Sequence, residues 1–325
     1  MAPSGEEKKT PVRSLRHHEG RYLRLTVSKV SDRVYLIDTL AVGEKNTVAA
    51  YLLKGSKIGL VDCGYASSTQ AVFDGLRELN VSPADVDYVI PTHVHLDHAG
   101  AAGHLLDAMP KAKVIAQERG VPHLTDPARL IQSATIVFGE EAIKLYGRPK
   151  GIPAERITPV GEEMHIDLGG LSLTATHTPG HAPHQISVYV EEEKVLIAAD
   201  AVGIVYPLFG VLIPTTPPPS LNPEELGRTA DRLAQMDSRL LLAPHFGVRT
   251  DPREVLAETK KKTNEWVSYV RKMKNTGASA DAIVASLKSE VSRESRVPEE
   301  SFPIYADVSV RISVNGILHY LEKNP

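Results

Sequence analysis

The sequence predicts an α+β protein with two β-rich halves and a small helical end, and three observations support this fold class. Short runs rich in β-branched residues, separated by Gly, Asn, Asp and Lys, begin near Arg21 and are typical of antiparallel strands. A second series of such runs begins near Leu171, and helix-forming residues dominate from about Arg249. We therefore expect a flexible tail, a main domain and a helical domain at 1–20, 21–248 and 249–325.

The first half should contain strands followed by alternating helices and strands. Four strands are predicted at RLTVSKV, RVYLIDT, TVAAYLLKG and KIGLVDCG. A helix is expected over residues 69–80, where three apolar residues share one face, and DVDYVIPT should form a buried strand. AAGHLLDAMP predicts a helix that ends at Pro110, AKVIAQ another strand, and residues 124–148 helical cover.

The second half repeats the pattern of the first. Strands are predicted at LSLTATHTPG, QISVYVEEE, KVLIAADAVG and RLLLAPHFG. KIGLVDCG and KVLIAADAVG are both apolar strands that begin with Lys and end in Asp, while VDYVIPTHVH and RLLLAPHFG both deliver histidine after proline. These similarities indicate a duplicated β-rich half.

The C-terminal segment should be helical. Apolar residues spaced by about 3.5 positions between Val255 and Met273 predict one helix, with Gly277 at its end and Ser279 as the cap of the next. The final segment, 306–321, alternates like a strand and also repeats like a helix. We favour a helix because of its length.

Composition restricts the classes of partner. The formal net charge of −3 over 325 residues gives no general attraction to nucleic acid or to anionic membranes. The single cysteine, Cys63, excludes an internal disulfide framework, and no apolar stretch approaches the length of a membrane span. We expect a cytoplasmic protein with a small-molecule substrate and no membrane partner, and a homodimer is the oligomer that we consider.

One short segment predicts a metal site. THVHLDHAG, residues 92–100, places three histidines and an aspartate in six positions after a buried strand. His93 and His95 point the same way in an extended segment, and Asp97 and His98 follow where the chain must turn. Further candidate ligands end other apolar strands or begin loops: His181, Asp200 and His245. Imidazole and carboxylate ligands without thiolate suit zinc, iron, manganese or cobalt.

The remaining histidines are interpreted differently. A single histidine in a loop is more often a surface or core residue than a ligand. His177 and His184 flank His181, and we consider both a substrate contact and a structural role for them. We assign a structural or surface role to the others: His17, His18, His104, His123, His165 and His319.

The motifs THVHLDHAG, TPGHAPH, AAD and APHFG, in this order, resemble the metallo-β-lactamase superfamily, whose signature is His-x-His-x-Asp-His, a single His, an Asp and a final His. The resemblance covers about residues 22–248. It implies a four-layer αββα sandwich as the catalytic domain, with a small C-terminal helical extension. It also implies that Asp62 orients the metal loop through hydrogen bonds. Its metal ligands would be His93, His95 and His181 for one ion, Asp97, His98 and His245 for the other, and Asp200 as the bridge.

Departures from other branches refine this resemblance. The commonest lactamases carry Arg at the position of His98 and Cys at that of Asp200, and flavin-linked di-iron relatives carry Glu at that of His95. The chain is therefore similar to the hydrolytic, dinuclear branch of glyoxalase II-like and lactonase-like enzymes. This implies two divalent ions, zinc first with iron or manganese as alternatives, and a bridging hydroxide that attacks the substrate. Asp97 and Asp200 would be catalytic as well as ligating.

The apolar loop after Asp200 and the helical end suggest two functions. Tyr206, Phe209 and Leu212 either line an apolar pocket, with Tyr206 donating to a developing oxyanion, or pack against residues 124–148. The first function is hydrolysis of a small ester, lactone or thioester with an apolar portion. The alternative is a nuclease or phosphodiesterase for RNA or DNA, because basic residues that could contact phosphate lie on the predicted helix: Lys260, Lys261, Lys262, Arg271, Lys272 and Lys274.

Overall fold

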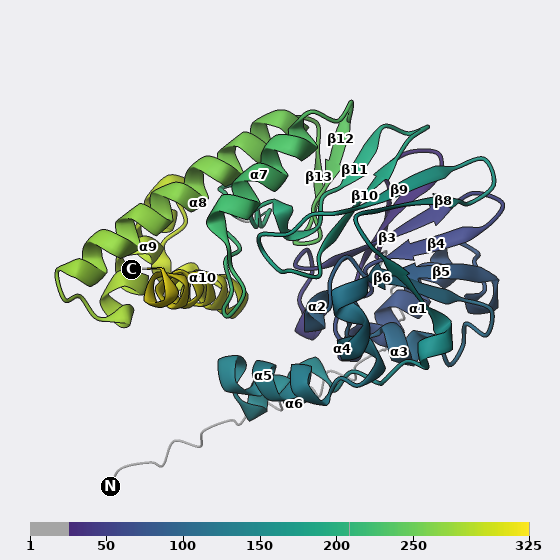
Figure 1. Cartoon of the computed structure of the whole chain (residues 1–325), viewed down its shortest axis with the longest axis horizontal. Helices are drawn as coiled ribbons and strands as arrows, with labels where there is room; N and C mark the ends of the chain where they lie inside the picture. Colours follow the sequence, from purple (N-terminus) through teal and green to yellow (C-terminus); the bar gives the residue numbers. More distant parts are fainter. Residues whose placement is uncertain (1–25, 208, 325) are drawn as a thin grey trace, which may run out of the picture.

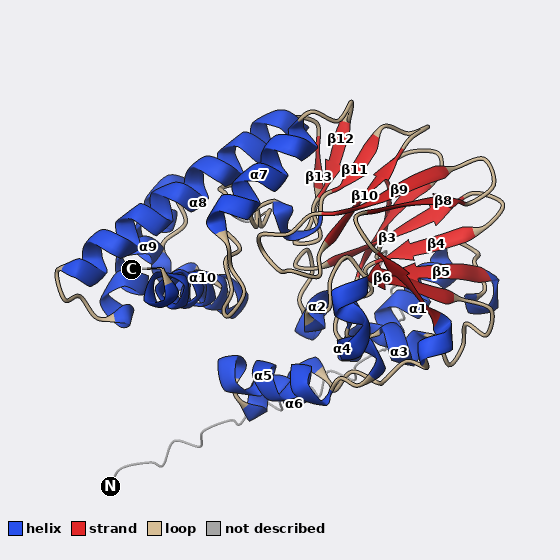
Figure 2. Ribbon diagram, viewed as in Figure 1, coloured by secondary structure: helices blue, strands red, loops and turns tan. Residues whose placement is uncertain are grey.

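The computed structural model describes residues 26–207 and 209–324, and it contains two β-sheets packed face to face with helices on their outer faces (Figures 1 and 2). This arrangement confirms the predicted α+β, four-layer sandwich. The expected tail at 1–20 lies outside the described residues. Within the described part, no helix combines the length and apolar character needed to cross a bilayer. The proposed limits of the domains stay a prediction.

The first sheet contains seven strands in the order of the sequence. Strands β1 to β4 pair antiparallel, whereas β4 to β7 pair parallel. Its strands are β1 (Val27–Lys29), β2 (Val34–Asp38), β3 (Ala49–Lys54), β4 (Ile58–Val61), β5 (Val86–Ile90), β6 (Lys113–Gln117) and β7 (Ile157–Val160).

The second sheet has six strands in the order β13-β12-β11-β10-β9-β8. Only its β11–β12 pair is parallel, which mirrors the parallel β4–β5 pair of the first sheet. The similar sequences found above therefore occupy equivalent places in the two halves. The strands are β8 (Glu163–Asp167), β9 (Ser172–His177), β10 (Ile186–Val190), β11 (Val195–Ile197), β12 (Leu240–Leu242) and β13 (Val248–Arg249).

The main core lies between the sheets. Leu53, Val61 and Ile90 from the first sheet share one buried cluster with Val188 and Ile197 from the second. Burial of both faces explains why β4 and β11 read as continuous apolar runs rather than alternating patterns. The carboxyl ends of these strands are thereby held in fixed positions relative to one another.

Helices cover the outer faces of the sheets (Figure 2). The expected helix at 69–80 is confirmed as α1, and the cover expected at 124–148 consists of three helices. The sequence reasoning missed β7, β8 and α7. The helices of this domain are α1 (Thr69–Glu78), α2 (Leu96–Ala99), α3 (Ala102–Leu105), α4 (Val121–Thr125), α5 (Ala128–Phe138), α6 (Glu140–Tyr146) and α7 (Pro223–Ala234).

Three helices form the C-terminal extension: α8 (Pro252–Asn275), α9 (Ala280–Ser295) and α10 (Ile304–Lys323). The Ser279 hydroxyl accepts from the backbone N–H of Ala282, as expected of a cap. Gly277, at φ +79°, lets the chain leave α8. Trp266 of α8 is only 1% exposed and belongs to the apolar cluster that joins the three helices. The ambiguous segment 306–321 is helical.

Candidate metal centre

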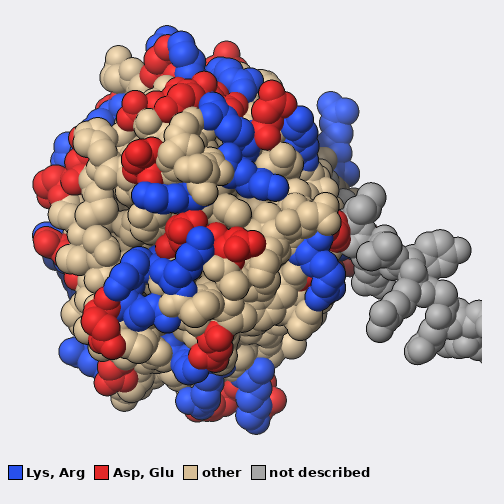
Figure 3. Space-filling view, turned by 90° about the vertical axis from the view of Figure 1, so that its right-hand side faces the viewer, with Lys and Arg blue, Asp and Glu red and all other residues tan. Residues whose placement is uncertain are grey.

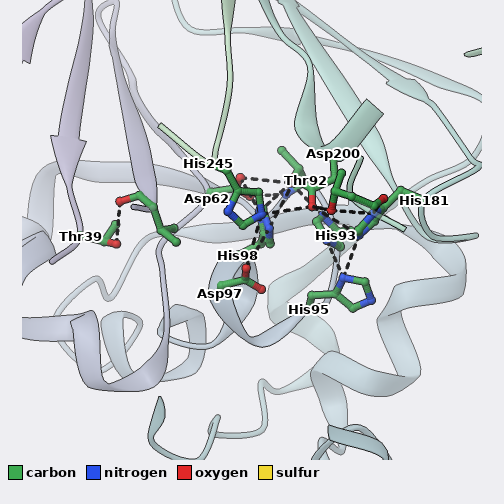
Figure 4. A network of polar contacts seen from close by, with 12 residues as sticks. Thr39, Asp62, Thr92, His93, His95, Asp97, His98, His181, Asp200 and His245 are labelled. Carbon is green, nitrogen blue, oxygen red and sulfur yellow. Dashed lines mark hydrogen bonds and ion pairs between the residues drawn. The ribbon is translucent and has the colours of Figure 1, made fainter. Parts of the chain in front are cut away.

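The seven candidate ligands meet at one edge of the sandwich because each follows the carboxyl end of a strand. The histidine motif follows β5 in the first sheet, and its Leu96–Ala99 portion forms α2. In the second sheet His181 follows β9, Asp200 follows β11 and His245 follows β12. Since β4 with β5 and β11 with β12 are parallel pairs, their ends lie side by side. Both sheets therefore supply side chains to one centre (Figure 4).

One group consists of three imidazoles. The Nδ1 atom of His95 lies 2.9 Å from Nε2 of His93 and 3.0 Å from Nε2 of His181. Their candidate ligand atoms all lie within 4.8 Å of one another. This is the set that the resemblance assigned to the first ion.

A second group combines imidazole and carboxylate. Asp97, His98 and His245 also offer ligand atoms within 4.8 Å of one another. Asp200 lies between the two groups, because its Oδ2 is 3.4 Å from Nε2 of His181 and 3.3 Å from Nε2 of His245. This position suits the proposed bridge. The structure thus brings all seven residues together, while their roles as ligands stay a prediction.

Hydrogen bonds on the far side of the rings set which nitrogen faces the centre. His181 Nδ1 lies 3.0 Å from the carbonyl oxygen of Thr215, to which it can only donate. His98 Nδ1 lies 3.0 Å from Oδ2 of Asp62. In both rings Nε2 is consequently the nitrogen that faces the centre, as metal coordination requires.

Asp62 is buried directly after β4 and connects the metal motif to the sheet. Its carboxylate accepts from the backbone N–H of Thr92 at 2.7 Å and from the Thr92 hydroxyl at 3.1 Å. Because that hydroxyl donates to Asp62, it can accept from His93 Nδ1, 3.2 Å away. The orienting role expected for Asp62 is supported by these contacts.

Three non-glycine residues with left-handed backbone surround the centre. Asp62 has φ 56°, Ala199, directly before Asp200, has φ 53°, and Phe246, directly after His245, has φ 79°. Such conformations cost free energy and persist where the surrounding structure imposes them. In each case the unusual backbone turns the chain at the point where a site side chain leaves its strand.

The charges of the centre fit divalent cations. Burial first, and neighbouring histidines second, keep the pKa of His93 and His95 well below the usual value, so their nitrogens carry free lone pairs. Burial also lowers the pKa of His98, but the carboxylates of Asp97, Asp62 and Asp200 outweigh it and raise that pKa to about 10. The site without metal therefore holds protons next to its carboxylates, where metal ions would supply positive charge.

Two buried polar atoms point to the same conclusion. Nε2 of His98 and Oδ1 of Asp200 are inaccessible to solvent and have no hydrogen-bond partner among the described residues. A buried polar atom without a partner is costly, and such atoms at one spot call for a bound group. Imidazole nitrogen and carboxylate oxygen, with no thiolate, are ligands for zinc, iron or manganese.

The loop after Asp200 packs on the C-terminal helices. Tyr206, Phe209 and Leu212 are at most 4% exposed, and the first two belong to the cluster of the C-terminal helices rather than packing on residues 124–148. The Tyr206 hydroxyl lies 3.0 Å from Oγ of Ser309 in α10. Its catalytic role stays a prediction.

Sequence reasoning missed the contribution of Thr92 and Thr215. Thr92 belongs to the quoted motif, and its position directly before His93 is the one sequence feature that could have indicated its contact with that ring. Thr215 lies in an irregular loop 34 positions after His181, so no spacing pattern connects them. Two other residues have structural contacts: His177 Nε2 lies 3.0 Å from the carbonyl oxygen of Pro183, and Cys63 is buried, with its thiol donating to the carbonyl oxygen of His98. The role of His184 stays a prediction.

Comparison with known proteins gives a consistent picture. A family model described as the metallo-beta-lactamase superfamily matches residues 43–245. A metallo-beta-lactamase fold-containing protein, ST1585 from Sulfurisphaera tokodaii, is 34% identical over 172 residues, which cover 52% of this chain and 61% of that protein. Its crystal structure superposes with a TM-score of 0.63, covering 71% of this chain and 86% of that one at 27% identity.

Two further relatives differ in what they support. A metallo-beta-lactamase family protein, TTHA1429 from Thermus thermophilus, covers 91% of this chain and 95% of its own at TM-score 0.68 and 23% identity, which supports the fold. The N-acyl homoserine lactonase AttM of Rhizobium radiobacter is 30% identical over 135 residues, or 41% of this chain and 47% of the lactonase. The chain thus matches about half the length of that enzyme.

Proposed function

Because this chain belongs to the metallo-β-lactamase superfamily, we propose that it is a dinuclear metal-dependent hydrolase of small esters, lactones or thioesters with an apolar portion. The observation that supports this most is the meeting of seven ligand-type side chains around buried atoms without partners. The likeness to a lactonase favours lactones within this class.

The proposed centre would hold two divalent ions, zinc first and iron or manganese as alternatives. His93, His95 and His181 would hold one ion, Asp97, His98 and His245 the other, and Asp200 both. When bound, the ions would supply a hydroxide near neutral pH and polarise the scissile carbonyl. Asp97 and Asp200 would offset part of their charge, and Asp62 and Thr215 would keep His98 and His181 oriented.

Tyr206 is the proposed donor to the oxygen that gains charge during hydrolysis. Burial raises the pKa of its phenol, so the hydroxyl keeps its proton at neutral pH. The Ser309 hydroxyl donates its own proton to the carbonyl oxygen of Tyr305 at 2.8 Å, so toward Tyr206 it can only accept. The Tyr206 proton is therefore directed to Ser309, and donation to a substrate requires this pair to separate.

Proton release by the zinc- or manganese-reconstituted protein tests the proposal. Acyl lactones, thioesters and simple esters would be supplied at constant pH, with metal content measured in parallel. We expect turnover of one chemical class, lost in the Asp200→Ala variant. If no compound in the panel is hydrolysed while two metal ions are bound per chain, the proposal is contradicted.

The alternative of a nuclease receives less support. Lys260 pairs with Asp231 at 2.6 Å and Lys262 with Glu294 at 2.6 Å, so these ammonium groups are already matched by carboxylates. The face shown in Figure 3 is the side of the sheets rather than that of α8, and there basic and acidic side chains are interspersed. Salt-dependent binding of RNA at low ionic strength would favour the alternative.

A further inference from the structure

Tyr65 and Tyr146 form a stacked pair that the proposed metal centre does not use. Tyr65 precedes the short 3-10 helix η2 (Ala66–Ser68), and Tyr146 is the last residue of α6. Their ring centroids are 4.3 Å apart with an interplanar angle of 13°, and both side chains are half-buried. Phe138 of α5 packs edge-on against Tyr146 at 5.7 Å. Three aromatic rings thus adjoin one another.

Two glycines fix this pair relative to the metal motif. Gly100 ends the motif, and a Cβ there would lie 3.0 Å from the Cα of Tyr65 and 2.8 Å from the backbone nitrogen of Ala66. Gly147, at φ +77°, follows Tyr146, and its Cβ would lie 3.0 Å from Cβ of Ala66. The segment that carries Tyr65 is therefore pressed between the metal motif and the end of α6, with no room for side chains at either glycine.

The pair lies beside the accessible side of the centre. Leu96, between His95 and Asp97, shares an apolar cluster with Tyr65 and Tyr146. Among the acidic ligands, the side chain of Asp97 is 19% exposed, whereas that of Asp200 is 3% exposed. Asp97 and the half-buried His95 therefore belong to the accessible side of the centre.

The phenols of the pair are suited to donate hydrogen bonds. Burial first, and the charge of Asp97 second, raise the pKa of both Tyr65 and Tyr146. Both hydroxyls consequently keep their protons at neutral pH. The pair thus combines two partly exposed aromatic rings with hydroxyls that keep their protons.

We infer that Tyr65 and Tyr146 form a substrate-binding wall that selects substrates with an aromatic ring on the acyl side of the scissile bond. This inference rests on the proposed function. A flat ring can stack on the fixed pair, where aromatic contacts are favourable beyond simple burial of apolar area. A short alkyl group lacks that contact, so the wall distinguishes the two.

Hydrolysis of two thioesters of one thiol, N-acetylcysteamine, tests the wall. Phenylacetyl and acetyl thioesters differ only in the ring, and Tyr146→Leu removes one ring of the wall while keeping an apolar side chain. We expect KM for the phenylacetyl thioester to rise about 3- to 10-fold and KM for the acetyl thioester to stay within about 2-fold. Tyr146→Phe, which retains the ring, should keep the preference.

Leu145→Ala is the matched control, since Leu145 is the neighbouring residue of α6 and its side chain is 56% exposed. Its selectivity should equal that of the unchanged protein. Equal effects of Tyr146→Leu on both thioesters, or the same effect in Leu145→Ala, would overturn the inference. Tyr65→Leu offers an independent variant should Tyr146→Leu not fold.

Binding of the hydrolysis products separates this inference from the proposed function. Calorimetry of the zinc-reconstituted protein with phenylacetate and with acetate needs no turnover. We expect phenylacetate to bind more tightly, and Tyr146→Leu to remove that difference. If the protein binds phenylacetate selectively but hydrolyses no thioester, the proposed hydrolase function is rejected and the substrate-binding wall is retained. Equal affinity for the two anions would reject the wall.

Discussion

The carboxylate of Asp200 lies 3.3 Å from the Nε2 atom of His245, although 45 positions separate the two residues in the sequence. Asp200 follows β11 and His245 follows the parallel strand β12, so the register of this pair places them together. The contact matters because Asp200 is also 3.4 Å from His181, which belongs to the other ligand group.

The Asp200→Ala variant should lose at least one metal ion and all hydrolytic activity. Its carboxylate is the only one within reach of both ligand groups among the described residues. Metal content by mass spectrometry and turnover would be measured on the same sample. Asp237→Ala is the control, since that carboxylate is 81% exposed and pairs with Lys194. A full metal complement with normal turnover would refute the bridge.

The Asp62→Asn variant should bind metal about 10- to 100-fold more weakly, as is typical when a group that orients a ligand is lost. The amide can still accept from Thr92 but cannot match the charge that holds His98 in its orientation. Competition with a chromophoric chelator measures the affinity. Asp87→Asn provides the comparison, because Asp87 accepts from the backbone of Ile58 in the same sheet without touching the centre. Unchanged affinity in Asp62→Asn would show that Asp62 does not orient the ligands.

Most of the fold and the seven candidate residues could be predicted from the sequence, whereas some strands and tertiary contacts could not. Strands such as β4 and β11 were recognisable because burial on both faces makes them continuously apolar. The strands β7 and β8 were missed since Ile157–Val160 contains a proline and Glu163–Asp167 alternates polar and apolar residues over a short span. Contacts of Tyr206 with Ser309 and of His181 with Thr215 depend on tertiary packing, which local patterns do not encode.

Loss of stability in acid should be smaller in a His184→Gln variant of the metal-free protein. Burial, and then the charge of His123, lower the pKa of His184 to about 3. The unfolded chain takes up this proton near pH 6.5, whereas the folded protein takes it up only near pH 3. The free energy of unfolding therefore decreases as the pH falls between these values, by about 1.4 kcal/mol per pH unit for this one group.

Urea unfolding at pH 7.5 and pH 4.5 checks this expectation. The difference between the two pH values should shrink in His184→Gln relative to the unchanged protein. His165→Gln is the surface control, because the side chain of His165 is 73% exposed. Parallel pH profiles for His184→Gln and the unchanged protein would show that burial of His184 carries no such cost.

Two substitutions separate the structural from the catalytic contribution of Tyr206. Both Tyr206→Phe and Ser309→Ala remove their shared hydrogen bond, so each should lower the free energy of unfolding by about 0.5–1.5 kcal/mol. Only Tyr206→Phe removes the proposed donor to the substrate, and we expect its kcat to fall while Ser309→Ala keeps its kcat. Thermal unfolding and initial rates would be compared. A similar fall of kcat in both variants would indicate that Tyr206 acts through packing.

The parallel strand pairs in both sheets have a consequence for the order of events during folding. His93 through His98 come from the first half of the chain, and Asp200 and His245 come from the second. Neither half alone contains the full set, so the centre exists only after the two sheets have docked. Metal uptake would thus be a late step, and the ion held by Asp97 and His245 would cross-link segments 148 positions apart. Retention of metal would report that the two halves are correctly assembled.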